Sequence, residues 1–172
     1  MAAPRWLNDE ERRTWIAFVY AQGLLFEQVE RDLQRDSNLP LAYYQALVVL
    51  SEHPNHAMRM GDLAEALTFS RSRMSHAITR LEQNGWIRRE QCAEDRRGSV
   101  AVLTDAGFHA LEAAAPQHVE SVRAHLFDQL SPEQVRNLRE VCETLVRHLL
   151  GSLNIEPPSV LPEPGYWEAT AR

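Results

Sequence analysis

A change of period at Gly85, from helical spacing to strand spacing, constrains the fold more than any other feature of this sequence. Residues 71–84 before it predict a helix, with Ser70 as the N-cap and Gly85 as the stop. Two short strands are predicted after it, at residues 86–92 and 99–103. The polar segment between them predicts that the two strands form a hairpin.

A short helix is predicted immediately upstream, over residues 60–67, followed by a tight connection at 68–70. Short helix, tight connection, capped helix and hairpin, in this order, predict a winged helix-turn-helix. In that arrangement the capped helix can lie in a DNA major groove, and the hairpin can reach the adjacent backbone or minor groove. Four apolar residues on one face of the capped helix are the expected core contacts: Met74, Ala77, Ile78 and Leu81.

Two helices are predicted before this region. The first covers residues 8–34, with Asn8 and Glu11 as a capping box. Its apolar residues occupy more than one side of the helix, so more than one side must be buried, the second against another subunit in a chain this short. It is expected to end at Asn38-Leu39-Pro40, because the residue before proline avoids the helical region. The second covers about 40–52.

Two more helices are predicted after the hairpin. One runs from Thr104 to about residue 129, and Pro116 should kink or break it near Ala115. The other begins at Ser131 and has apolar residues three and four apart, which is typical of a helix-packing seam. The expected fold is therefore mostly α with a small β-hairpin wing. We divide the chain into an N-terminal dimerisation helix (1–37), a DNA-binding lobe (38–104; recognition helix about 70–84, wing about 87–103), C-terminal dimerisation helices (105–150) and a proline-rich tail (151–172).

Positive charge is concentrated in the predicted helix-turn-helix and hairpin. The whole chain has a formal net charge of -6, which argues against a nonspecific polycation. Residues 71–97 nevertheless hold seven arginines against four acids, a local charge of +3. All 18 basic residues are arginine, whose planar fork suits phosphates and guanine edges.

Over roughly residues 8–150 the chain resembles the MarR (multiple antibiotic resistance regulator) family of transcription factors. The matching segments are 63–67 (LAEAL), 81–87 (LEQNGWI) and 95–107 (DRRGSVAVLTDAG), the last of which fits the family pattern D-x-R-x(3–5)-LT-x-x-G. The resemblance implies a homodimer formed by the first and last helices, bound to a palindromic operator in double-stranded DNA. It also implies a small-molecule effector, aromatic or phenolic, that releases a repressor from its operator.

The candidate DNA-binding residues lie at the start of the recognition helix and at the tip of the wing. A helix N-terminus favours phosphate, hydroxyl groups form short hydrogen bonds, and arginine can form two bonds to guanine. The resemblance places Arg97 in the minor groove, oriented by Asp95, while Arg96 contacts phosphate. A solvated helix start and an ordinary charged hairpin tip are the alternatives. The full set is Ser70, Arg71, Ser72, Arg73, Ser75, His76, Arg96 and Arg97, with Asp95 orienting Arg97.

The resemblance and the helical spacing also give candidate residues for an effector pocket and for a dimer interface. Four aromatic residues are the candidates for lining an effector pocket, with plain core or dimer contacts as the alternative: Trp15, Phe18, Tyr43 and Tyr44. The candidate dimer interface consists of Trp15, Val19, Val135, Leu138, Cys142, Leu145 and Leu149.

Other chemistry is weakly supported by the sequence. The two cysteines are too few for a disulfide scaffold; we expect Cys142 in the core and Cys92 exposed on the wing. The histidines, His118 and His125 included, lack metal spacing and are expected to be ordinary surface residues. We expect no metal, no cofactor and no catalytic site. With no apolar run of about 18 residues and no secretory signal pattern, a cytoplasmic protein without a membrane partner is expected.

The main expectation is therefore a sequence-specific, homodimeric DNA-binding regulator, acting as a repressor. The alternative is a winged-helix module that binds a protein or a ligand and no longer binds DNA. The net charge of -6 favours the alternative, and the arginines of the wing favour the regulator.

Overall fold

The computed structural model describes residues 3–67, 71–92 and 98–153, which form α-helices and a small antiparallel sheet. None of the described helices is long and apolar enough to cross a membrane. The elements occur in the order that the sequence predicts, with one strand added. They are α1 Asp9–Ser37, α2 Leu41–Glu52, a 3-10 turn Pro54–His56, β1 Ala57–Arg59, α3 Met60–Ala66, α4 Arg71–Gln83, β2 Ile87–Gln91, β3 Ser99–Leu103, α5 Asp105–His125, a 3-10 turn Phe127–Gln129 and α6 Pro132–Leu153.

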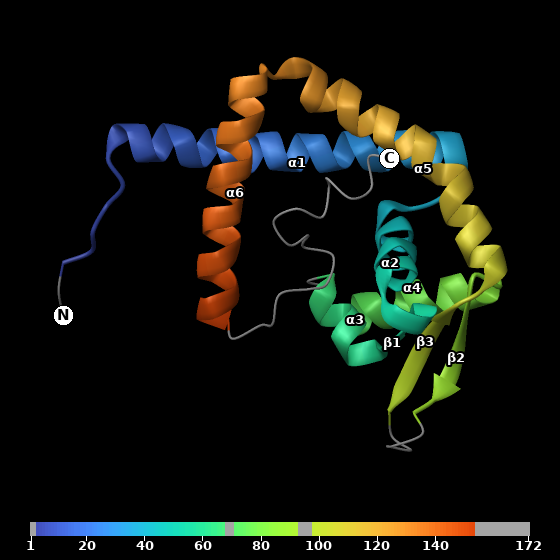
Figure 1. Cartoon of the computed structure of the whole chain (residues 1–172). Coiled ribbons are helices and arrows are strands. Elements are labelled where there is room, and N and C mark those ends of the chain that lie inside the picture. Colours follow the sequence, from blue (N-terminus) through green and yellow to red (C-terminus); the bar gives the residue numbers. More distant parts are fainter. Residues whose placement is uncertain (1–2, 68–70, 93–97, 154–172) are drawn as a thin grey trace.

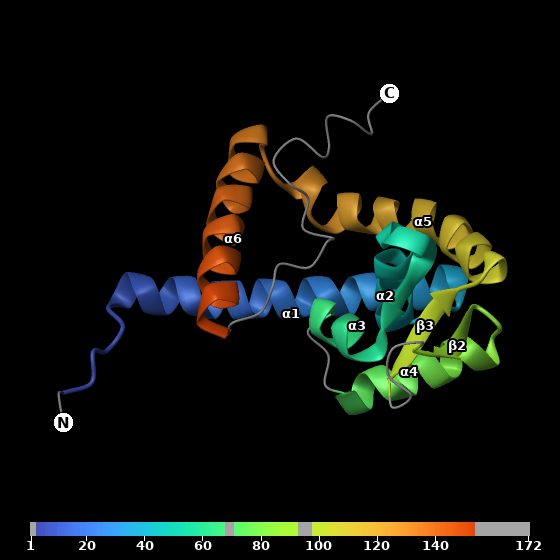
Figure 2. The same cartoon turned by 60° about the horizontal axis from the view of Figure 1, so that its bottom comes forward.

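The helices form a compact lobe and a long arm (Figure 1). The lobe contains α2, α3, α4 and the sheet. α5 packs along α1 and also contacts α2, so it joins the arm to the lobe. Figure 2 shows α6 standing away from the lobe, toward the N-terminal end of α1. The molecule therefore presents the helix-turn-helix and the wing at one end, and at the other α6 and the N-terminal half of α1, whose residues are mostly exposed.

The hydrophobic core lies within the lobe, around α2. Leu47 and Leu50 of α2 are completely buried, and they belong to a core cluster that includes side chains from every other element of the lobe. α1 reaches this core near its C-terminal end, through Val29 and Leu33. The four predicted core residues of the recognition helix are confirmed: Met74, Ala77, Ile78 and Leu81 are all buried.

The two ends of α1 are capped by different means. Asn8 Oδ1 accepts a hydrogen bond from the Glu11 amide at 2.9 Å, and the Asn8 amide donates to the Glu11 carboxylate at 2.8 Å. The predicted capping box is therefore confirmed. The helix continues to Ser37, three residues past the predicted range of 8–34 and up to the predicted break at Asn38-Leu39-Pro40. Asn38 adopts a left-handed conformation (φ 51°) and closes the last turn on the Gln34 carbonyl.

The sheet has a third strand that the sequence did not predict. β1 pairs antiparallel with β3, which lies between β1 and β2, and Met58 faces Ala101 across the pair. β1 has three residues, of which only Met58 is buried. A strand this short shows no alternating pattern from which it could be predicted. The predicted hairpin is confirmed, with Ile87 opposite Leu103.

Pro116 does not break α5. The sequence predicts a kink or a break near Ala115. A break is excluded, because the helix is continuous from Asp105 to His125, and Figure 1 shows that it changes direction along its course. A proline inside a helix removes one backbone hydrogen bond and bends the axis without ending the helix when packing on both sides holds it. α5 packs on α1 and α2. The helix ends earlier than the predicted residue 129.

Candidate nucleic-acid interface

α4 is held in the lobe by its apolar face and exposes its polar face. Gly85 ends it in a left-handed conformation (φ 72°), and the Trp86 amide donates to the Leu81 carbonyl at 2.9 Å, as the sequence predicts for a glycine stop. On the opposite side Ser72, Ser75 and His76 are exposed. A recognition helix requires this division, since the side chains that hold it in place cannot also contact DNA.

The other candidates at the start of α4 are placed only in part. Arg71 and Arg73 belong to the first turn of the helix, and their side chains lie outside the described part of the structure. Ser70, the predicted N-cap, also lies outside the described residues. Ser72, Ser75 and His76 are thus the candidates that the structure places on the exposed face.

The wing is described as far as its two strands. β2 and β3 run side by side from the lobe, and the Cys92 amide donates to the Gly98 carbonyl at 3.0 Å (Figure 1). Asp95, Arg96 and Arg97 lie outside the described residues. Cys92 is buried, so the expectation of an exposed cysteine on the wing is wrong. Its position directly after an exposed strand suggested solvent, but only 9% of the residue is exposed.

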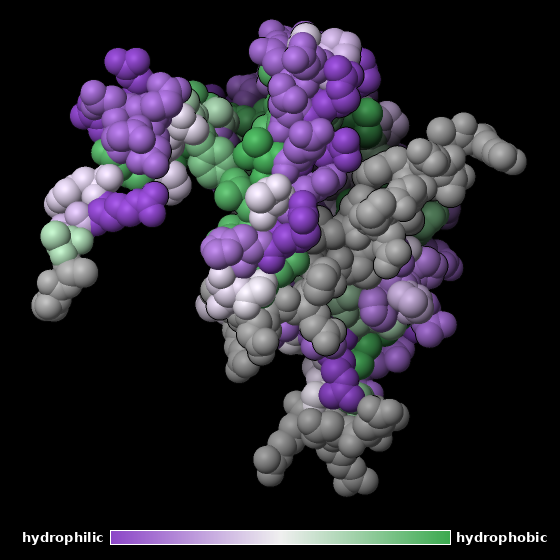
Figure 3. Space-filling view, turned by 60° about the vertical axis from the view of Figure 1, so that its left-hand side comes forward, coloured by the Kyte–Doolittle hydropathy of each residue, from purple (hydrophilic) through white to green (hydrophobic). Residues whose placement is uncertain are grey.

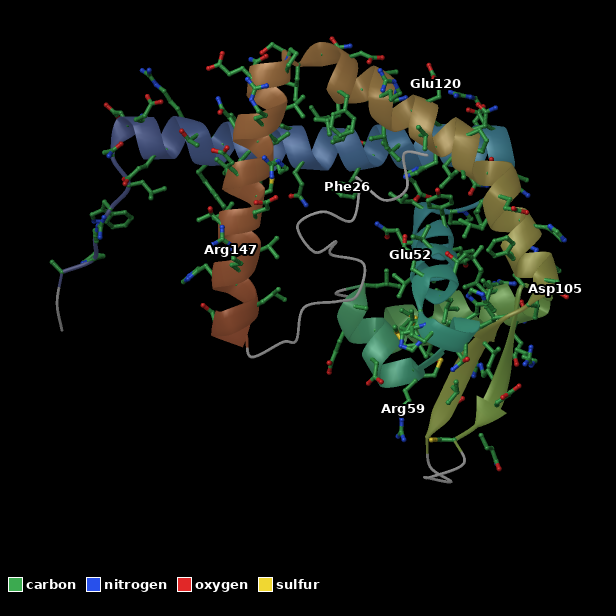
Figure 4. The ribbon with its side chains drawn as sticks, viewed as in Figure 1. Phe26, Glu52, Arg59, Asp105, Glu120 and Arg147 are labelled. Carbon is green, nitrogen blue, oxygen red and sulfur yellow. The ribbon has the colours of Figure 1, made fainter. Side chains whose placement is uncertain are left out.

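A hollow of about 460 Å³ lies between the start of α3, α4 and the end of β3 that is nearest the tip of the wing. Ser75 and Ser99 line it together with Arg59, which the sequence analysis did not single out. Figure 4 shows Arg59 projecting at the end of the lobe that carries the wing. The signal that could have found it is its place directly before α3, at the edge of the helix-turn-helix.

Arg89 ties the wing to the recognition helix. Its Nη2 donates to Thr79 Oγ1 at 2.7 Å, and its Nε lies 3.1 Å from the Glu82 carboxylate. Arg88 is paired with Glu90 within the strand, at 2.7 Å. The guanidinium of Arg89 is thus held between two elements in the free protein, and it fixes the position of β2 relative to α4.

The LT-x-x-G end of the motif has a structural role. Thr104 Oγ1 donates to the Gly85 carbonyl at 2.7 Å and accepts from the Gly107 amide at 3.1 Å, which caps α5. A side chain on Gly107 would collide with the Trp86 carbonyl, because its Cβ would lie 2.0 Å from that oxygen. Thr104 and Gly107 therefore dock α5 against the turn that ends α4.

A cavity of about 560 Å³ lies between the arm and the lobe, lined by α1, α2, α5 and the end of α3. Among the predicted pocket residues Tyr44 lines it, and Tyr43 packs against the core beside it. Trp15 and Phe18 do not line it in the single chain, and their assignment to an effector pocket stays a prediction. They lie on the N-terminal half of α1, exposed and 6.3 Å apart by ring centroids.

His118 is the unusual polar residue of this cavity. Its ring lies 4.3 Å from that of Tyr44, and its Nδ1 is buried without a hydrogen-bond partner. Burial lowers the pKa of His118 below its usual value and raises the pKa of Tyr44, with a smaller contribution from the charge of Glu52. Both side chains are therefore neutral near pH 7. The expectation of an ordinary surface histidine is wrong for His118.

A second polar cluster joins α1 to α5. Asp32 is buried; its Oδ2 accepts a hydrogen bond from Ser121 Oγ at 2.8 Å and lies 2.9 Å from His125 Nε2. Its Oδ1 accepts from Arg35 at 2.9 Å. The bond from Ser121, followed by those from His125 and Arg35, lowers the pKa of Asp32 against the opposing effect of burial. His125 thus links two helices and is not an isolated surface residue.

Large apolar side chains are exposed on the N-terminal half of α1 and on α6. Figure 3 shows apolar residues at the surface between these two segments, while their outward faces are hydrophilic. Trp15 is 58% exposed and Leu149 51%, values that leave most of each side chain in water. Cys142 is also exposed in the single chain, where the sequence predicted a core residue. The remaining candidates, Val19, Val135, Leu138 and Leu145, are exposed or partly exposed.

A short helix, an anchored and polar-faced second helix and an adjacent two-stranded wing define a winged helix-turn-helix protein. A model of the MarR family matches residues 37–98, which cover most of the lobe. The chain is also similar to Sco3205, a MarR family transcriptional regulator from Streptomyces coelicolor whose crystal structure is a complex with DNA. The two share 44% identity and a TM-score of 0.82, over 91% of this chain and 97% of that one. The chain belongs to the MarR family of transcriptional regulators, which are not enzymes.

Curated relatives are more distant and match a shorter segment. The regulator PecS of Dickeya dadantii is 31% identical over 97 residues, 56% of this chain and 58% of PecS. The transcriptional repressor MprA of Escherichia coli is 31% identical over 107 residues, 62% of this chain and 60% of MprA. The chain thus spans about three fifths of the length of these relatives.

Proposed function

We propose that this protein is a homodimeric, sequence-specific regulator that binds a palindromic operator in double-stranded DNA in the cytoplasm. The observation that carries the proposal is the exposed polar face of α4, with Ser72, Ser75 and His76, on a helix whose other face is anchored in the core. Similarity at 44% identity to a protein crystallised with DNA supports it. Arg71, Arg73, Arg96 and Arg97 are the proposed cationic contacts, with Asp95 orienting Arg97.

The proposed dimer is formed by the exposed apolar faces of α1 and α6. Apolar area removed from water contributes about 25 cal/mol per Å², so side chains such as Trp15 and Leu149 favour association when a second chain covers them. A dimer also places two copies of α4 on one operator, and two-fold symmetry of the protein then matches a palindrome.

We further propose that the protein is a repressor released by a small molecule in the cavity between arm and lobe. A relative named as a repressor supports the first part. The position of the cavity supports the second, because Leu67 in its wall directly precedes the connection to α4. An effector releases the protein from DNA only if it binds the DNA-competent and incompetent conformations with different affinity.

The test is the affinity of the protein for its own upstream DNA, measured over a range of salt concentrations against a scrambled fragment of equal length. The logarithm of the association constant should fall with the logarithm of salt with a slope of about -0.9 per neutralised phosphate. The upstream fragment should bind more tightly than the scrambled one at every salt concentration. Equal, weak binding of both fragments would contradict the proposal.

The alternative is a winged-helix module that binds a protein or a ligand without DNA. The overall charge of -6 favours it, because a net negative protein is repelled by phosphate at long range. The same titration separates the two functions, since the alternative predicts no tight complex with either fragment.

A further inference from the structure

Arg89 joins the two elements that the proposed function places in DNA. It lies on β2, and its guanidinium bonds to Thr79 Oγ1 at 2.7 Å and to the Glu82 carboxylate at 3.1 Å, both on α4. Figure 2 shows β2 close to α4, on which it packs. We propose that Arg89 is a positioning residue for operator binding: it does not touch DNA, and it holds the wing at the angle at which the wing and α4 reach the same half-site. This inference rests on the proposed function.

The hydrophobic core holds the wing at its base. Ile87, the first residue of β2, is buried, and the four residues after it are exposed. β3 is buried over its last three residues and only partly buried over its first two. Packing therefore fixes the root of the hairpin, and the direction of β2 beyond Ile87 needs another contact. Arg89 supplies it two residues further along the strand. A rotation at this point displaces the tip of the wing most, and the tip carries the proposed groove contact.

Arg89 makes its contact on the face of α4 that is proposed to read bases. Thr79 is exposed and lies one helical turn after Ser75 and His76. Its hydroxyl donates to the Ser75 carbonyl at 2.8 Å and accepts from Arg89. The wing is thus bonded to the base-reading face itself. Because exposed ion pairs contribute little to the free energy of unfolding, the effect of this bridge should appear in DNA binding and not in stability.

A direct bond from Arg89 to a DNA phosphate is the alternative role, and Glu82→Ala separates the two by sign. If Arg89 bound phosphate, the substitution would free its guanidinium and remove an acid near DNA, so binding should tighten. If Arg89 positions the wing, the wing loses part of its hold on α4, and operator affinity should fall about threefold to tenfold because binding must then order it. Glu90→Ala is the matched control. It removes the same charge from β2, where Glu90 pairs with Arg88 within the strand, and its affinity should not fall.

A cycle of substitutions with Arg97→Ala separates positioning from a general loss of structure. Arg89→Gln should lower operator affinity about tenfold in the original protein. It should have little further effect in Arg97→Ala, because the wing contact that it would misplace is already gone. A structural defect or an independent phosphate contact would cost the same in both proteins. Unchanged or tighter binding by Glu82→Ala, or equal losses in the two halves of the cycle, would overturn the proposal.

Amide relaxation of the DNA-free protein tests the bridge without the proposed function. The order parameters of the β2 amides should be near 0.85, as in rigid backbone, in the original protein and Glu90→Ala, and lower in Arg89→Gln and Glu82→Ala. Those of α2 should be equal in all four proteins, which shows that the lobe stays folded. Equal order parameters of β2 in all four would overturn the inference even if the protein binds its operator. If they fall as expected and the original protein does not bind its upstream DNA, the bridge is supported and the proposed function is contradicted.

Discussion

At the scale of single residues, Gly107 shows how a motif can have a structural role within a DNA-binding lobe. Replacing a helical glycine by alanine normally favours the helix by about 1 kcal/mol. At Gly107 the new Cβ would lie 2.0 Å from the Trp86 carbonyl. Gly107→Ala should therefore lower the free energy of unfolding by about 1–3 kcal/mol, the usual cost of overpacking. Chemical denaturation measures it. Gly61→Ala, with open space around the new methyl group, is the control and should cause no loss.

The wing and the recognition helix should contribute differently to DNA binding. An arginine in a narrow minor groove responds to shape and charge, whereas a side chain in the major groove distinguishes base edges. Arg97→Ala should therefore weaken binding in each half-site and flatten the salt dependence, with little change in base preference. Changes at Ser75 or His76 should alter the preferred base at particular positions, and each lost contact should cost about 1–3 kcal/mol.

Selection of binding sites from a random DNA pool, combined with salt titrations, measures both effects. The thermal stability of the variants should equal that of the original protein, because Ser75 and His76 are exposed in the absence of DNA. If Arg97→Ala binds with unchanged affinity and salt slope, the wing does not enter the groove.

At the scale of elements, the link between α1 and α5 depends on one buried carboxylate. The pKa of Asp32 is lower in the folded protein than in the unfolded chain, chiefly through the hydrogen bond from Ser121. As the pH falls, Asp32 therefore takes up a proton at a higher pH in the unfolded chain than in the folded protein. The contribution of Asp32 is complete above its unfolded pKa, about 4, and is lost as the pH falls through its folded pKa.

Asp32→Asn should therefore destabilise the protein at neutral pH and reduce the loss of stability in acid. Urea unfolding at several pH values between about 3 and 7 measures both effects. Asp9→Asn is the matched control, since Asp9 pairs with Arg12 on the exposed surface of α1 and contacts neither Ser121 nor His125. If the free energy of unfolding falls with pH in the same way in Asp32→Asn and in the original protein, Asp32 does not make the packing of α1 on α5 depend on pH.

Periodicity predicted the elements whose burial has a regular pattern. The apolar face of α4, the stop at Gly85 and the capping box at Asn8 all follow from local rules, and the structure confirms them. The strand β1 could not be predicted, because its three residues pair with β3 across about 40 positions of sequence. His118 and Asp32 were missed for a related reason: their burial depends on helices that are distant in sequence.

The candidate site was predictable to a similar extent. The exposed positions Ser72, Ser75 and His76 follow from the helical period, since they lie opposite the buried face. The bridge from Arg89 to Thr79 was not predicted, because it requires the relative position of β2 and α4. Trp15 and Phe18 were assigned to a pocket from the resemblance and from their place on the first helix. They do not line the cavity of the single chain, because that cavity meets α1 only at Leu25, Phe26 and Val29.

At the scale of the whole molecule, the exposed apolar faces of α1 and α6 predict that the protein functions as a dimer and not as a single chain. Leu138 and Leu145 lie one above the other on α6, 38% and 44% exposed, and no α6 residue from 132 to 152 is buried. A helix of this kind is stable in a folded protein only when its apolar stripe is covered. Leu138→Glu with Leu145→Glu should therefore abolish the dimer, because a charge buried in an apolar interface costs at least a few kcal/mol.

Sedimentation of the double variant should show a monomer at micromolar concentration, with or without a loss of helical circular dichroism, since many obligate dimers have no stable monomer. Asn137→Glu with Thr144→Glu is the matched control. It adds the same charge at the same spacing on the polar side of α6, and it should remain a dimer. The two variants together separate the effect of the stripe from that of charge alone. A dimer that persists in the Leu138→Glu, Leu145→Glu protein would exclude the α6 stripe from the interface, and the second copy of α4 would then have to be positioned by α1 alone.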